Sequence, residues 1–102
     1  MVATKINIPM DQIRDFCQRW KITEFALFGS VLRDDFRPDS DVDVLVTFAP
    51  GAKWIYWDGW FEMIEELQVI FGRKVDLVIK RTLRNPFRRH EILRTQQVVY
   101  AA

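Results

Sequence analysis

The sequence predicts an α+β protein in which a small mixed β-sheet is packed with helices. Apolar residues recur with helical spacing in some segments and alternate with the two-residue period of strands in others. The two kinds of segment follow one another along the chain: helix, strand, helix, strand, helix, strand, helix and a small final strand. With 102 residues, 49% of them hydrophobic and 28% charged, the composition suits one domain over residues 1–102.

The first elements surround a turn that contains glycine. A helix is expected after Pro9, because one apolar stripe is formed by Ile13, Phe16, Cys17 and Trp20. Cys17 lies on this stripe, which favours a core thiol, and a single cysteine excludes an internal disulfide or a multi-cysteine zinc site. A short buried strand over residues 23–28 then ends at Gly29-Ser30, a turn that leads into a short helix over 31–35.

The later elements have equally clear boundaries. Three valines, at 42, 44 and 46, alternate with Asp41, Asp43 and Leu45 as in a strand that ends at residues 49–51. A second helical stripe follows, closed by Gly72 and formed by Trp57, Trp60, Phe61, Ile64, Leu67 and Phe71. Residues 75–79 form a third strand. Asn85 and Pro86 suit the first positions of a helix that runs to about Arg94, and residues 97–100 suit an edge strand.

Charge is unevenly distributed along the chain. Residues 34–43 hold five aspartates and one base, whereas residues 73–94 hold eight bases and two acids, although the chain's net charge is only +1. An acidic pocket beside a basic surface suits a metal–polyphosphate ligand, but on charge alone two solvated patches are the favoured explanation. The longest uncharged stretch has nine residues, against about twenty for a membrane span. The N-terminus lacks the apolar block of a secretion signal, and acids begin by Asp11. The single cysteine favours the reducing cytoplasm as the compartment.

Three acids and one turn carry the candidate chemistry. Asp41 and Asp43 are two residues apart on a strand and therefore project from the same face. Two close carboxylates repel each other unless a cation lies between them, and Mg²⁺ prefers such oxygen ligands. Asp76 completes a cluster if its strand lies beside Asp43, and Gly29-Ser30 offers a phosphate a close approach to the backbone. Taken singly, each feature is also typical of a solvated strand face or an ordinary turn.

The joint pattern resembles a known family. The runs FGSVLRDDFRPDSDVDVLV, FGRKVDLVIK and NPFRRHEILRTQQVVYAA are similar to the minimal nucleotidyltransferases of the DNA polymerase beta superfamily. The resemblance implies that Asp41, Asp43 and Asp76 are catalytic and bind two Mg²⁺ ions, with ATP as substrate. It places Gly29, Ser30, Arg33 and Ser40 at the nucleotide. Gly29 and Ser30 would hold its phosphates, Arg33 would contact phosphate or brace the turn, and Ser40 would cap the turn entering the strand.

The same resemblance implies a partner. Nucleotidyltransferases of this size resemble the antitoxins of pairs with HEPN-domain ribonucleases, so AMP would pass from ATP to a tyrosine of a HEPN toxin. A chain this small has no second lobe to enclose an acceptor, which agrees with a protein substrate. A non-catalytic antitoxin that blocks the toxin by binding is the alternative. The ribonuclease motif Arg-x4-His is absent, since Asn85 stands where its arginine would be, and direct binding of nucleic acid or membrane is not expected.

Two surface features stay open at this stage. Five aromatic residues at the start of the second stripe (Trp54, Tyr56, Trp57, Trp60 and Phe61) suit a core or an exposed docking site. Arg84, Arg88 and Arg89 on the last helix suit either a solvated face or contact with triphosphate, RNA or an acidic partner.

Overall fold

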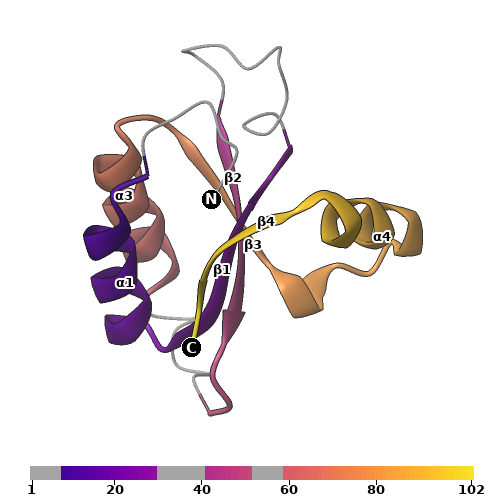
Figure 1. The fold of residues 1–102 in the computed structure, drawn as a ribbon, viewed down its shortest axis with the longest axis horizontal. Coiled ribbons are helices and arrows are strands. Elements are labelled where there is room, and N and C mark those ends of the chain that lie inside the picture. The colour runs from indigo at the N-terminus through magenta and orange to yellow at the C-terminus, as the bar shows by residue number, and fades with distance from the viewer. Residues whose placement is uncertain (1–7, 30–40, 52–58) are drawn as a thin grey trace.

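A four-stranded sheet with helices on both faces forms the protein, as the computed structural model shows for residues 8–29, 41–51 and 59–102 (Figure 1). The strand order is β3-β2-β1-β4. β1 pairs antiparallel with β2 and β4, whereas β2 and β3 are parallel, so the predicted mixed α+β architecture is confirmed. In chain order the elements are α1 (Met10–Arg19), β1 (Ile22–Phe28), β2 (Val42–Phe48), α3 (Trp60–Phe71), β3 (Val75–Ile79), η2 (Lys80–Thr82), α4 (Pro86–Thr95) and β4 (Gln97–Ala101).

The sheet separates two apolar clusters of unequal size. Helices α1 and α3 cover one face and α4 lies on the other side (Figure 1). The larger cluster, under α1 and α3, includes Phe16, Leu67 and the three valines of β2. The smaller cluster brings Leu45 of β2 together with Ile92 of α4. Strands β1, β2 and β3 bury apolar residues, and β2 buries them on both faces because α4 covers part of the second one.

The helices confirm most, but not all, of the predicted stripes. In α1 the buried residues are Ile13, Phe16 and Cys17, as expected. In α3 the buried residues are Met63 and Leu67, and Phe61 is 78% exposed, so the prediction that Phe61 belongs to the buried stripe is wrong. Position 61 lies about 100° around the helix from position 60, which turns its ring to solvent.

The ends of the helices follow from local chemistry. Gly72 ends α3 with a φ of 71°, a left-handed conformation that glycine adopts at low cost. The Asn85 side chain accepts hydrogen bonds from the backbone N–H groups of Phe87 and Arg88, and Pro86 occupies the first turn of α4. Both predicted boundaries and the final edge strand are confirmed. Within the described residues, no helix is long and apolar enough to cross a membrane.

Candidate active site

The alternation of β2 places its acidic residues away from the main core. Val42, Val44 and Val46 point into the cluster under α1 and α3, whereas Leu45 packs in the cluster beside α4. Successive side chains of a strand point to opposite faces. Asp43 therefore shares the α4 side of the sheet with Leu45, near the end where β2 begins.

Strand register brings a second acid beside Asp43. In the parallel pair of β2 and β3, Asp43 is the direct partner of Asp76. Neighbouring residues in register project from the same face of a sheet, so both carboxylates lie on the α4 side. Asp43 is half-buried and Asp76 is exposed. The third strand therefore lies beside Asp43, which is the condition for Asp76 to join its site.

Gly29 completes this end of the sheet from β1. Its φ of 74° is left-handed, and a Cβ built on it would overlap Oδ2 of Asp43. Phe28, the residue before it, is the register partner of Asp43. The Asp43 carboxylate thus lies directly against the backbone of the turn, in space that any other residue at position 29 would fill.

Asp41 stands immediately before β2 and is exposed. The strand begins with a hydrogen bond of 2.9 Å from the Val42 N–H to the Lys74 carbonyl, which ties the starts of β2 and β3 together. The two acids on either side of Val42 are therefore anchored at the same point of the sheet. Arg73 and Lys74, at the approach to β3, bring positive charge to this end.

The donor set fits Mg²⁺ bound together with substrate. No group of three or more His, Cys, Asp or Glu side chains in residues 8–29, 41–51 and 59–102 lies close enough to hold one ion. Mg²⁺ commonly takes only one or two protein carboxylates and fills its other positions with water and substrate phosphates. The adjacent carboxylates of Asp43 and Asp76, with Asp41 nearby, suit that mode rather than a closed cage of protein ligands.

Three predicted nucleotide-binding residues, Ser30, Arg33 and Ser40, lie outside the described residues, as do the predicted helix over 31–35 and the aromatic residues Trp54, Tyr56 and Trp57. Among the described site residues, the structure brings together Gly29, Asp43 and Asp76. These come from β1, β2 and β3, three adjacent strands of the sheet.

An ion pair lies on the α4 side of the sheet, at the end opposite Asp43 and Asp76. Lys80 Nζ lies 3.1 Å from Oε1 of Glu24, and the Arg89 guanidinium donates to the Lys80 carbonyl at 3.0 Å. Arg89 therefore links α4 to the end of β3 and does not share the exposure of Arg84 and Arg88.

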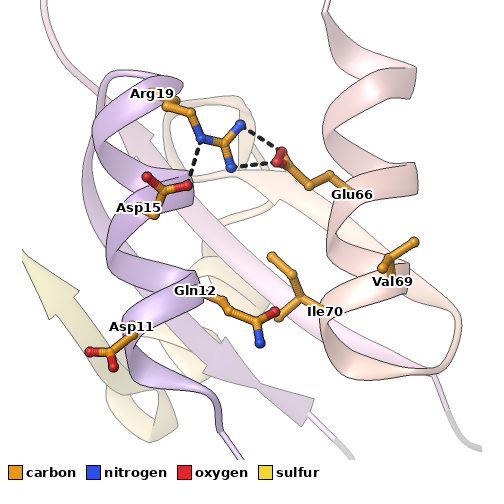
Figure 2. A pocket seen from close by; sticks show the side chains of 7 residues that line it. All are labelled: Asp11, Gln12, Asp15, Arg19, Glu66, Val69 and Ile70. Carbon is orange, nitrogen blue, oxygen red and sulfur yellow. Dashed lines mark hydrogen bonds and ion pairs between the residues drawn. The ribbon is translucent and has the colours of Figure 1, made fainter.

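A charged cluster between α1 and α3 is a feature that the sequence analysis missed. Arg19 pairs with Asp15 on its own helix and with Glu66 across a groove between the two helices (Figure 2), and the Trp20 indole donates to Glu66 at 3.0 Å. Partial burial acts to raise the pKa of Glu66, but the hydrogen bonds from Arg19 and Trp20 outweigh it and hold that pKa below its ordinary value. Because α1 and α3 cover the other face of the sheet, this cluster is separate from the aspartates.

The chain is similar in sequence to one protein family and to individual proteins of two organisms. The model of the nucleotidyltransferase domain family matches residues 10–99. A Thermococcus cleftensis protein adenylyltransferase, MntA, is 33% identical over 72 residues, which cover 71% of this chain and 70% of the relative. A Methanocaldococcus jannaschii protein, provisionally named a protein adenylyltransferase, is 36% identical over 69 residues, which cover 68% of each chain.

Two solved structures share the fold of this chain. A structure provisionally described as a minimal nucleotidyltransferase aligns with a TM-score of 0.69 and 31% identity, covering 86% of each chain. A toxin–antitoxin structure with AMP-PNP aligns with a TM-score of 0.66, covering 92% of this chain and 74% of that one. Identity to the latter is 20%, so that likeness concerns the fold alone.

Proposed function

The chain belongs to the nucleotidyltransferase domain family, and from this premise we propose that it is a protein adenylyltransferase antitoxin. It transfers AMP from ATP to a tyrosine of a HEPN-domain ribonuclease toxin and so neutralises the toxin. The observation that carries the proposal is the register of Asp43 with Asp76, with Gly29 against Asp43. The names of the two relatives described above support the activity.

In the proposed reaction the tyrosine hydroxyl oxygen forms a bond to the α-phosphorus of ATP. The bond from that phosphorus to the oxygen bridging to the β-phosphate breaks, and pyrophosphate leaves. The hydroxyl proton passes to the carboxylate of Asp76, whose exposed position allows an acceptor from another protein to approach it. The product is a tyrosine esterified with AMP.

The phosphates and their counter-ions are assigned to the same end of the sheet. Asp41, Asp43 and Asp76 would hold Mg²⁺, two ions by the family resemblance. When bound, the metal supplies positive charge to the attacking and leaving oxygens. Gly29 is the proposed backbone contact for the β- and γ-phosphates. Ser30, Arg33 and Ser40 remain proposed nucleotide contacts.

A HEPN partner is proposed from the family resemblance and from the nature of the structural relatives. One solved neighbour is a tri-AMPylated Shewanella oneidensis HEPN toxin in complex with its MNT antitoxin. ATP, the donor, is supplied in the cytoplasm, where we propose that the reaction takes place.

Intact-mass analysis tests the proposal directly. The reading frames beside this chain's gene are searched for a HEPN-domain protein with Arg-x4-His, and that protein is incubated with this chain, ATP and Mg²⁺. We expect one or more AMP additions on tyrosine, and a toxin that stays inactive after this chain is removed. The Asp76→Asn variant should bind the toxin and leave its mass unchanged.

The same experiment distinguishes an adenylyltransferase from an antitoxin that acts only by binding. In that case the toxin keeps its original mass and recovers its ribonuclease activity once this chain is removed. Equal protection of cells by wild type and Asp76→Asn, at matched low expression, would also favour the binding antitoxin.

A further inference from the structure

Strand β3 forms an edge of the sheet and carries Asp76. It pairs with β2 on one side and stands at the end of the strand order. An edge strand presents a row of backbone N–H and C=O groups to which an extended segment of another protein can pair. The acid proposed to receive the acceptor's proton thus belongs to a strand that can itself bind a peptide.

The hydrogen bonds show which backbone groups of β3 face outward. The Lys74 carbonyl accepts from Val42 of β2, and alternate residues of a strand direct their backbone groups to the same edge. Asp76 and Val78 therefore face β2, whereas Val75, Leu77 and Ile79 face outward. Two contacts agree: the Val75 N–H donates to Gln68 Oε1, and the Ile79 carbonyl accepts from the Thr82 hydroxyl.

Three outward backbone groups remain at the centre of the strand. Neither the N–H and C=O of Leu77 nor the N–H of Ile79 has a partner on the outer side among the residues that the structure describes. An added strand would hydrogen-bond to these groups. The contacts of Val75 to Gln68 and of Ile79 to Thr82 mark the two ends of the free stretch.

An open groove of about 450 Å³ lies along this stretch and is lined by Trp60, Leu77, Val78, Ile79 and Thr82. The lining is mainly apolar, and the volume falls within the roughly 300–1,000 Å³ typical of ligand sites. Lys74 and Arg84, both exposed, stand before and after the groove in the chain. Its free backbone, apolar wall and flanking positive charge suit an extended segment that is apolar in the middle and acidic at its ends.

We propose that the edge of β3 is the docking site for the acceptor: an extended segment of the target protein adds to the sheet here and presents its tyrosine to Asp76. The inference rests on the proposed function, because it requires a protein acceptor. In an added strand, residues in register with Leu77 and Ile79 point toward Trp60. The residue between them is in register with Val78, on the α4 side of the sheet that also carries Asp76 two residues along the strand. The predicted motif is therefore apolar–tyrosine–apolar with acidic flanks.

A synthetic peptide tests this docking without any catalysis. The probe is acetyl-Glu-Thr-Val-Tyr-Val-Thr-Glu-amide, added to the ¹⁵N-labelled chain without ATP. We expect the amide resonances of Leu77 and Ile79 to shift and their hydrogen exchange to slow, because these N–H groups gain partners. The amides of Asp76 and Val78 already face β2 and should change less. Shifts confined to α4 or to the groove between α1 and α3, or no shifts at 1 mM peptide (about the weakest binding worth scoring), would overturn the proposal.

Backbone methylation of the peptide tests strand addition specifically. N-methylation of both valines and N-methylation of the tyrosine remove donors from the two opposite edges of the peptide. We expect one of these peptides to bind about tenfold more weakly and the other to bind as the parent does. Equal effects of the two modifications would contradict pairing through the backbone.

Matched variants of the chain test the groove. Trp60→Ala removes an aromatic wall and should weaken peptide binding about tenfold. Phe61→Ala changes the adjacent aromatic, which is 78% exposed and does not line the groove, and should have no effect. Because Trp60 also packs on the core, Thr82→Glu is a second probe: its carboxylate should repel the acidic peptide, whereas Thr95→Glu on α4 should not. Equal binding by Thr82→Glu and Thr95→Glu would overturn the assignment.

Failure of the docking proposal can be distinguished from failure of the proposed function. Peptide binding at β3 without AMP transfer to any HEPN protein would reject the function and retain the docking site. AMP transfer that is unaffected by Trp60→Ala and Thr82→Glu would retain the function and reject the docking site.

Discussion

Gly29→Ala offers the sharpest test of how the turn and the carboxylates depend on each other. The glycine has a φ of 74°, and its missing Cβ leaves the space occupied by Oδ2 of Asp43. An alanine would incur a left-handed backbone cost of about 1–2 kcal/mol. Asp43 would also have to leave its rotamer, which costs about 0.5–1.5 kcal/mol more. We therefore expect a total loss of about 1.5–3.5 kcal/mol in unfolding free energy, obtained by adding these two costs.

Gly72→Ala is the matched control. Gly72 has a φ of 71°, almost the same as Gly29, but a Cβ there would meet nothing within 4 Å. This variant should lose only the backbone part, about 1–2 kcal/mol, and keep its activity. The difference between the two variants isolates the contact with Asp43.

Two assays read out the comparison. Urea unfolding gives the stability of each variant, and AMP transfer followed by intact mass gives its activity. We expect Gly29→Ala to lose at least about 100-fold in rate, because a small displacement of a catalytic group has effects of this size. Full activity in Gly29→Ala, or equal losses of activity in Gly29→Ala and Gly72→Ala, would refute the reasoning.

Three other predictions concern single side chains. Asp43→Asn should abolish AMP transfer with Mg²⁺ as the only metal while keeping the wild-type circular dichroism spectrum; wild-type turnover would reject its assignment. The lowered pKa of Glu66 means that its ionised form stabilises the fold above pH 4.5, its unperturbed value, and that this contribution disappears as pH falls through the lower folded pKa. Glu66→Gln should therefore cost about 1 kcal/mol at pH 7 and show a shallower acid loss of stability in urea titrations, whereas parallel pH curves would contradict the argument. Burial raises the pKa of the Cys17 thiol to about 12, so a thiol reagent at pH 8 should label this cysteine only at the rate of unfolding, and rapid labelling of the native chain would count against a core position.

Local chemistry made much of the molecule predictable from sequence. The spacing of Ile13, Phe16 and Cys17 predicted the buried face of α1, and the left-handed conformation at Gly72 and the cap at Asn85 followed from residue type. These features depend on interactions within a few residues, so periodicity and capping preferences are sufficient to predict them. Reliance on local pattern also explains the wrong prediction at Phe61. An aromatic residue beside an apolar stripe cannot be distinguished from a member of that stripe until its packing partners are known.

Only the tertiary structure decided how separate segments meet. The sequence predicted that Asp41 and Asp43 share a strand face, but the pairing of Asp43 with Asp76 depended on β3 lying beside β2. The bond from Arg19 to Glu66 joins residues 47 apart, beyond the reach of any local pattern. The free edge of β3 is likewise a property of strand order. Strand order and register result from the packing of the whole chain against its core, so segments distant in sequence acquire their shared chemistry only when the sheet forms.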